Sequence, residues 1–120
     1  MQHANQPLAL IVGGSSGIGL ATARLLLARE VTTVIAGNSL EKLETAQREL
    51  SSLGTVEMLQ ANLYESNDTQ RIIAFAENHS RHITYLVNAA GYFKPTPFLD
   101  HTAKDYDAYL DLNRALFFIS

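Results

Sequence analysis

Short runs of apolar and β-branched residues alternate along the chain with segments in which apolar residues recur every three or four positions. The short runs predict strands, and the longer spacing predicts helices that bury one face. Strands are expected at residues 8–12, 32–36, 55–60 and 85–88. Helices are expected at 18–29, from 38 or 39 to 53, from 66 or 67 to about 79, and from about 102 onward. Such regular alternation predicts an α/β fold with a parallel sheet between two helical layers.

Two details of this alternation refine the predicted architecture. The first strand is continuously apolar, as expected for a strand buried on both faces, whereas the third alternates with polar residues and is expected nearer an edge. The second helix should bury Leu40, Leu43, Ala46, Leu50 and Leu53 and end at Gly54. The prediction is a doubly wound parallel sheet, incomplete, with about four strands and flanking helices.

Composition and charge narrow the possible functions. The chain is 47% apolar and 18% charged, which is ordinary globular usage, and its net charge is -3. Nine scattered basic residues argue against a nucleic-acid partner. The absence of cysteine excludes disulfides and thiolate chemistry, and the spacing of the four histidines is not typical of a metal site. A polar N-terminus and the lack of a long apolar run predict a cytoplasmic protein that does not span a membrane.

A glycine-rich loop between the first strand and the first helix carries the most specific chemistry. Gly13, Gly17 and Gly19 allow a sharp bend and leave no Cβ in front of the helix N-terminus, where free N–H groups attract an anion. Ser15 and Ser16 add hydroxyl donors. No Gly-Lys-Ser/Thr sequence follows, which excludes a P-loop. The loop therefore predicts a site for the pyrophosphate of a dinucleotide.

The spacing Gly-x-x-x-Gly-x-Gly is one of several segments that match a known family. The others are Leu10-Ile11-Val12, Val34-Ile35-Ala36-Gly37-Asn38, Asn62-Leu63, Leu86-Val87-Asn88-Ala89-Ala90-Gly91 and Leu110-Asp111-Leu112-Asn113. With them the chain resembles the short-chain dehydrogenase/reductase family over nearly its whole length. The resemblance implies that residues 1–120 form the N-terminal, cofactor-binding part of a single NAD(P)-binding Rossmann domain.

By this resemblance, the cofactor is held by residues from four separate segments. They are Gly13, Ser15, Ser16, Gly17, Ile18, Gly19, Asn38, Ser39, Asn62, Leu63, Asn88, Ala89 and Gly91. Asn62 stands where the family commonly has an aspartate that accepts a hydrogen bond from the adenine amino group, and an amide oxygen can also accept one. The side chain of Asn88 is also expected to form a hydrogen bond that links neighbouring strands.

The end of the second strand bears on the choice between NAD and NADP. An acid there would bind the ribose 2′-hydroxyl and favour NAD, but this chain has Gly37. Members of the family that prefer NADP tend to have an arginine next, where this chain has Asn38 and then Ser39. Polar neutral donors tolerate a phosphate better than they replace a carboxylate, so NADP is favoured over NAD. Asn38 could equally be a simple helix cap.

The chemistry implied by the family is hydride transfer between the nicotinamide and an alcohol or carbonyl substrate, using a serine and a Tyr-x-x-x-Lys motif. None of Lys42, Lys94 and Lys104 has a tyrosine four residues before it, so the catalytic serine, tyrosine and lysine are expected beyond residue 120. Residues 1–120 alone are expected to be inactive. Asn113 lies on the apolar stripe of the last helix, where the family's asparagine holds a water that relays protons; a packing role is the alternative.

Two other classes of function use a fold of this kind. The fold could serve a non-catalytic dinucleotide-binding or sensor module. A methyltransferase is disfavoured because those enzymes usually have an acid after the second strand, where this chain has Gly37 and Asn38. The family resemblance implies a homo-dimer or homo-tetramer, with the helix that contains Asn113 in one interface.

Overall fold

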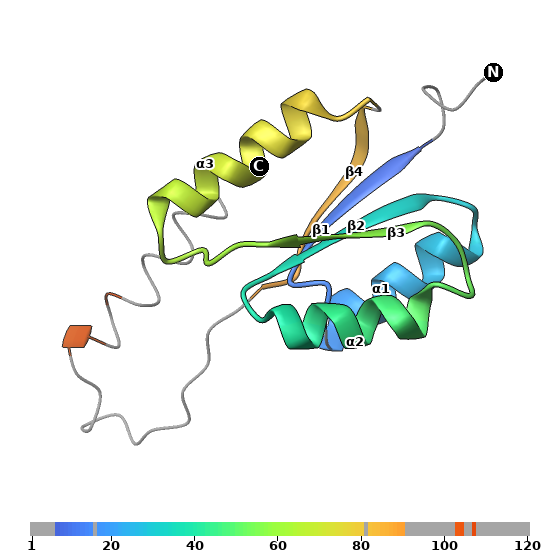
Figure 1. The fold of residues 1–120 in the computed structure, drawn as a ribbon, viewed down its shortest axis with the longest axis horizontal. Helices are drawn as coiled ribbons and strands as arrows, with labels where there is room; N and C mark the ends of the chain where they lie inside the picture. The colour runs from blue at the N-terminus through green and yellow to red at the C-terminus, as the bar shows by residue number, and fades with distance from the viewer. Residues whose placement is uncertain (1–6, 16, 81, 91–102, 105–106, 108–120) are drawn as a thin grey trace.

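A computed structural model describes residues 7–15, 17–80, 82–90, 103–104 and 107 (Figure 1). Its elements are β1 (Leu8–Val12), α1 (Gly17–Ala28), β2 (Thr32–Gly37), α2 (Leu40–Leu50), β3 (Val56–Gln60), α3 (Ser66–Asn78) and β4 (Ile83–Asn88). The predicted alternation of strands and helices is confirmed. The expected helix from about residue 102, with Asn113, lies largely outside the described residues, of which Ala103, Lys104 and Asp107 are helical.

The four described strands form one parallel sheet in the order β3-β2-β1-β4. The apolar strand β1 lies inside the sheet, where Leu8 pairs with Thr32 of β2 on one side and Ile83 of β4 on the other. The polar alternation of β3 correctly placed that strand at an edge of the described sheet. Since all strands run the same way, their carboxyl ends meet at one edge of the molecule.

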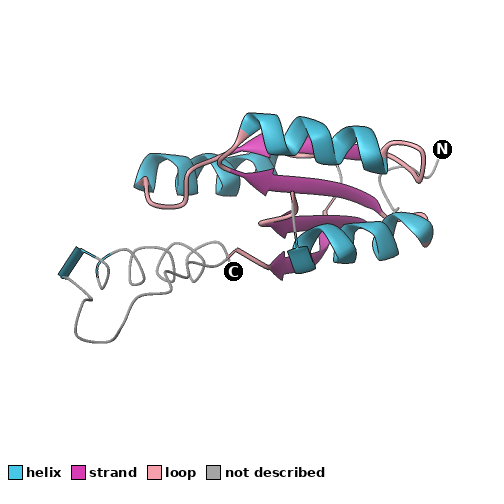
Figure 2. Cartoon of the chain, turned by 90° about the horizontal axis from the view of Figure 1, so that it is seen from below, coloured by secondary structure: helices cyan, strands magenta, loops and turns pink. Residues whose placement is uncertain are grey.

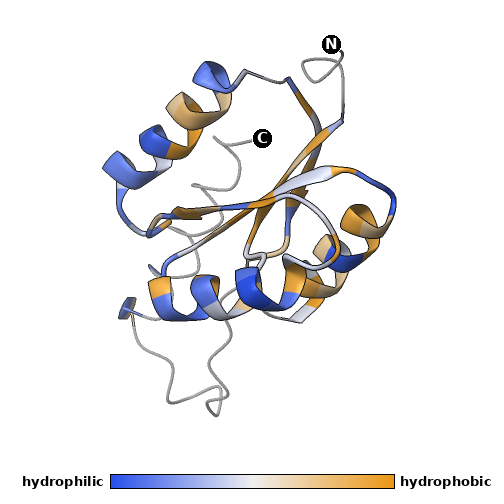
Figure 3. Ribbon diagram, turned by 45° about the vertical axis from the view of Figure 1, so that its right-hand side comes forward, coloured by the Kyte–Doolittle hydropathy of each residue, from blue (hydrophilic) through white to orange (hydrophobic). Residues whose placement is uncertain are grey.

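Helices cover both faces of this sheet (Figure 2). Alternate residues of β1 and β2 pack against opposite helical layers. On one face, Ile11 and Ile35 join Ala23 of α1 and Leu43 of α2 in a buried cluster. On the other, residues such as Leu10 and Val34 pack with Ile72 of α3. Figure 3 shows the apolar residues gathered on the strands and on the helix faces turned toward them. Each fully buried Leu or Ile side chain stabilises the fold by about 1.5–3 kcal/mol.

Helix α2 is shorter than predicted and buries less of its length. It ends at Leu50 with Ser51 as its C-cap, so Leu53 and Gly54 lie beyond it. The side chains of Leu40 and Leu53 are 45% and 44% exposed. Its buried residues are Leu43, Ala46 and Leu50, and including Leu40 and Leu53 in the stripe was wrong. Apolar spacing alone did not show that the helix ends at Leu50.

The start of α3 also differs from the sequence expectation. Neither Ser66 nor Asn67 is its N-cap; that position is Glu65, whose side chain makes no capping hydrogen bond. Asp68, in the first turn, instead accepts the backbone N–H of Asn62 through Oδ2 at 2.7 Å. The helix is therefore tied to the loop before it by a carboxylate inside the helix.

Helix α1 ends in a Schellman motif. The N–H of Glu30 donates to the carbonyl of Leu27, and that of Val31 donates to the carbonyl of Leu26, both at 3.0 Å. Glu30 holds the left-handed position, with φ of 65°, where glycine is the usual residue. The motif turns the chain directly into β2.

Within the part of the chain that the structure describes, no helix is long and apolar enough to cross a bilayer.

Candidate functional site

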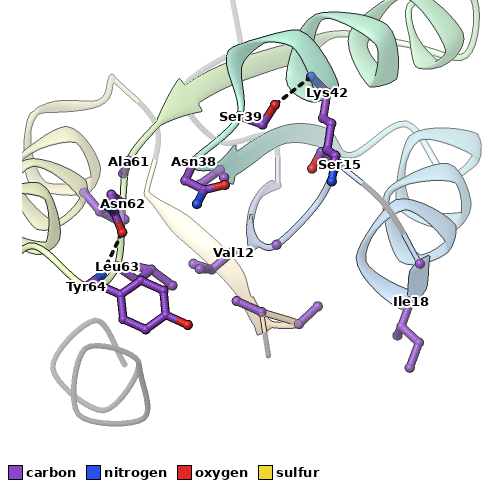
Figure 4. Close-up of a pocket in the computed structure, with 17 residues that line it drawn as sticks. Val12, Ser15, Ile18, Asn38, Ser39, Lys42, Ala61, Asn62, Leu63 and Tyr64 are labelled. Atoms are coloured by element: carbon purple, nitrogen blue, oxygen red, sulfur yellow. Dashed lines mark hydrogen bonds between the residues drawn. The ribbon is translucent and has the colours of Figure 1, made fainter. Parts of the chain in front are cut away.

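A cleft of about 460 Å³ opens at the carboxyl ends of the strands (Figure 4). The segments at the ends of β1, β2, β3 and β4 all contribute to its wall, among them residues 13, 15, 17 and 18, and residues 37–39, 61–64 and 89–90. In an open α/β sheet, ligands bind outside the carboxyl ends of the strands, where neighbouring connections diverge to opposite faces. Here that divergence lies at β1, whose neighbours β2 and β4 continue the sheet in opposite directions.

The end of β1 and the start of the glycine loop are hydrogen-bonded on both sides. The N–H of Gly13 donates to the carbonyl of Ala36 in β2 at 2.7 Å, and the N–H of Ala89 donates to the carbonyl of Val12 at 2.8 Å. Gly13 has φ of +87°, and a Cβ added to it would lie 2.6 Å from the backbone nitrogen of Ala90. Only glycine therefore allows β1 to turn this close to the segment that follows β4.

Gly17 and Gly19 differ in what surrounds them. Gly17 begins α1 with φ of +58° and lines the cleft, and a Cβ added there would meet no atom within 4 Å. Gly19 is buried behind the loop, because a Cβ at that position would overlap the carbonyl oxygen of Gly13. Gly17 thus keeps the helix N-terminus open to the cleft, whereas Gly19 lets the helix pack against the loop.

The segment after β2 forms the next part of the wall. Ser39 is the N-cap of α2, and its Oγ accepts the backbone N–H of Lys42 at 3.3 Å. Asn38 lines the cleft and is not the cap; its backbone carbonyl accepts a hydrogen bond from Gln60 at 3.2 Å. Gly37 has room for a side chain, since an added Cβ would lie 3.5 Å from Ser15 Oγ, an ordinary contact.

The segment after β3 is held by a clamp formed by Asp68 and Arg71 of α3. Asp68 accepts the N–H of Asn62, while Arg71 donates to Asp68 Oδ1 at 2.9 Å and to the carbonyl of Gln60 at 2.8 Å. The hydrogen bond from the Asn62 backbone, and then that from Arg71, lower the pKa of Asp68 below its ordinary value of 3.8. The clamp fixes the chain just where it enters the cleft.

Within that segment the side chain of Asn62 is already engaged. Its Oδ1 accepts the backbone N–H of Tyr64 at 3.0 Å, the contact drawn in Figure 4. A carbonyl oxygen has a second lone pair, so this bond orients the amide without using up its capacity to accept.

The structure brings most of the predicted site residues to one cleft. Those lining it are Gly13, Ser15, Gly17, Ile18, Asn38, Ser39, Asn62, Leu63 and Ala89. Two do not line it: Gly19, which is buried behind the loop, and Asn88, which ends β4 opposite Val12. Ser16, Gly91 and Asn113 lie outside the described residues.

Two residues with useful side chains also line the cleft although the sequence did not single them out as binding residues. They are Lys42, in the first turn of α2, and Tyr64, two residues after Asn62. Lys42 is the only charged residue among the described residues of the lining. The sequence signal that could have identified Lys42 is its position three residues after the capping Ser39. The first turn of a helix that starts at this edge of the sheet faces the cleft.

Comparison with known proteins agrees with this arrangement. The family model described as short chain dehydrogenase matches residues 7–119. The chain belongs to the short-chain dehydrogenase family. Among similar proteins, an uncharacterized oxidoreductase of Bacillus subtilis (strain 168) is 34% identical over 90% of this chain and 41% of its own length. Nodulation protein G of Rhizobium sp. (strain N33) is 35% identical over 88% of this chain and 42% of its length.

Solved structures of similar proteins share the fold. A short-chain dehydrogenase from Sphingobium yanoikuyae in complex with NADPH has a TM-score of 0.85 at 29% identity, covering 94% of this chain and 45% of that one. A bulky-bulky ketone specific alcohol dehydrogenase from Comamonas testosteroni has a TM-score of 0.85 at 28% identity, covering 96% and 47%. The chain therefore spans a little under half the length of the relatives it matches.

Proposed function

We propose that residues 1–120 form the cofactor-binding part of an NAD(P)-dependent oxidoreductase. The observation that carries the proposal is the glycine loop, which opens the N-terminus of α1 into a cleft bounded by the ends of all four described strands. Membership of the short-chain dehydrogenase family supports it. The bound nicotinamide would supply the hydride, or accept it, in a reaction that interconverts an alcohol and a carbonyl compound.

The residues of the cleft fit the parts of a dinucleotide. The open side of Gly17 leaves the first N–H groups of α1 available to a pyrophosphate. Asn62 and Leu63 would hold the adenine, and the small residue Ala89 would allow close approach of the ribose next to the nicotinamide. In the same proposal, Gly91 would also allow close approach of the ribose and the nicotinamide, and Ser16 would donate a hydrogen bond from its hydroxyl group to the pyrophosphate.

We further propose that the preferred cofactor is NADP. Because residue 37 is glycine, no carboxylate stands at the end of β2. No negative charge at that position repels the 2′-phosphate of NADP, and no carboxylate is present there to bind the ribose 2′-hydroxyl of NAD. The similar Sphingobium yanoikuyae dehydrogenase was solved with NADPH, which supports the same preference.

We propose that the rest of the catalytic machinery lies outside residues 1–120. The serine and the Tyr-x-x-x-Lys pair would follow residue 120, and Asn113 would hold a water that relays protons to that lysine. The substrate would be a small alcohol or carbonyl compound, and the full protein would be a homo-dimer or homo-tetramer.

The direct test is binding followed by turnover in the full protein. NADPH is expected to bind about tenfold more tightly than NADH, measured from the change in nicotinamide fluorescence. A panel of aldehydes and ketones then identifies turnover from the loss of nicotinamide absorbance. If the full protein binds neither NADPH nor NADH, the proposal is refuted. Tight binding with no turnover on any carbonyl compound would favour the non-catalytic sensor module instead.

A further inference from the structure

We propose that Lys42 is the residue that binds the 2′-phosphate of NADP and thereby sets the cofactor preference. The inference rests on the proposed function, since it assigns a residue to part of the same cofactor. Lys42, a cation, would then be the main partner of that phosphate, in place of the neutral donors Asn38 and Ser39.

The charge of the cleft supports this assignment. Lys42 is the only charged residue among the described residues that line the cleft, and no described carboxylate lines it. Glu41, its neighbour in the sequence, is exposed and does not line the cleft. A lone cation in a lining without acids is a favourable environment for a doubly charged phosphate group.

The backbone of Lys42 is fixed in place. Its N–H donates to the capping Oγ of Ser39, and the N–H of Leu43 donates to the carbonyl of Ser39 at 3.0 Å. Leu43 is fully buried in the core, so the first turn of α2 cannot rotate without exposing it. With Leu43 facing the sheet, Lys42 starts from a defined point on the wall of the cleft.

The ammonium group of Lys42 is available for a ligand. No hydrogen bond or ion pair joins it to any residue in the part of the chain that the structure describes, whereas Arg24 and Arg71 are each paired with a carboxylate at 3.0 and 2.9 Å. In Figure 4 the side chain extends from α2 toward the glycine loop, where Ser15 is labelled. Ser15 Oγ lies beside Gly37, the expected position of the ribose.

Two adenine nucleotides isolate the contribution of the 2′-phosphate. Adenosine 2′,5′-bisphosphate carries it and adenosine 5′-monophosphate does not, so the ratio of their dissociation constants reports on this phosphate alone, independently of turnover. Calorimetric titration of the full protein is expected to show that Lys42→Met lowers the affinity for the bisphosphate about tenfold. The affinity for the monophosphate should stay within about twofold, and Lys42→Arg should retain most of the ratio.

The control variant is Arg48→Met, which removes one exposed positive charge from the other end of α2, outside the lining. It is expected to leave the ratio unchanged, which separates local binding from the general effect of charge. A ratio that stays high in Lys42→Met would overturn the assignment to Lys42 while leaving the NADP preference standing. Equal affinity for the two nucleotides in the unmodified protein would overturn both. If neither nucleotide binds, the proposed function itself fails.

Discussion

Gly17 and Gly19 are two residues apart, yet substitution of each is expected to harm a different property. Gly17→Ala places a methyl group in open space, so the fold persists and its free energy of unfolding falls by about 1 kcal/mol because of the positive φ. The same methyl group points into the proposed pyrophosphate site. NADPH affinity is therefore expected to fall about tenfold or more, measured by fluorescence titration of a protein with unchanged circular dichroism.

Gly19→Ala is the matched comparison. Its methyl group would overlap the carbonyl of Gly13, so the helix must move away from the loop. Such overpacking typically costs about 1–3 kcal/mol, which thermal unfolding will detect. Equal losses of stability in the two variants would contradict the assignment of separate roles.

Gly37→Asp is expected to abolish the preference for NADPH. An added Cβ makes only ordinary contacts, so the variant should fold, and its carboxylate would bind the ribose hydroxyl of NAD and repel the phosphate of NADP. The ratio of NADPH to NADH affinities should fall by about tenfold or more. Gly37→Asn has nearly the same shape without the charge and serves as the control. If both variants change the ratio equally, charge is not the cause.

Among the elements, the end of α1 offers a gain in stability. Glu30 occupies a left-handed position that glycine adopts without strain. Glu30→Gly is expected to raise the free energy of unfolding by about 1 kcal/mol, because C′ of a Schellman motif favours glycine. Chemical denaturation measures this change. Glu30→Ala removes the same carboxylate but keeps a Cβ, so an equal gain in that variant would trace the effect to charge instead.

The clamp between α3 and the segment after β3 is expected to weaken in acid. The pKa of Asp68 is lower in the folded protein than its ordinary value of 3.8, so its contribution to stability is present above that pH. It is lost as the pH falls through the lowered pKa. The difference in melting temperature between the unmodified protein and Asp68→Asn should therefore shrink below about pH 4. Glu44→Gln, an exposed change on α2 outside the clamp, is the matched control variant.

The local sequence predicted the elements better than their ends. Periodicity identified every described strand and helix, because burial on one or both faces is encoded in neighbouring residues. It missed the end of α2, because whether Leu53 is buried depends on where the chain turns rather than on its spacing. It also placed the N-cap of α3 on Ser66 or Asn67, because a carboxylate inside the helix that binds back to Asn62 leaves no short-range signature.

The candidate site was predictable where glycine geometry or the family resemblance pointed to it. Gly13 and Gly17 were found because turns and open helix ends require particular residues. Lys42 was missed as a binding residue because its importance comes from the absence of other charges around the cleft, which only the folded arrangement reveals. Gly19 was placed in the site, but its contact is with the loop behind it.

In the whole molecule, the β4 side of the sheet carries an exposed apolar surface. Tyr85 and Leu86 are 46% and 36% exposed, and β4 has a partner on only one side among the described residues. Such an edge promotes association. Residues 1–120 expressed alone are expected to bind a hydrophobic dye and to aggregate with rising concentration, whereas the full protein should not. Turnover by the isolated segment would contradict the proposal that the catalytic groups follow residue 120.

The position of β1 between β2 and β4 also has a consequence for how the chain acquires its structure during synthesis. Leu8 meets Thr32 early, but its other neighbour, Ile83, is added only after two more helices and a strand have been made. Pairing between residues so distant in sequence is slow, because the entropy of closing the long loop must be overcome before the contacts form. One side of the most apolar strand therefore waits unpaired while the ribosome completes the chain. The glycine loop next to it gains its contact with the segment after β4 late as well, because Ala90, against which Gly13 lies, is made after β4.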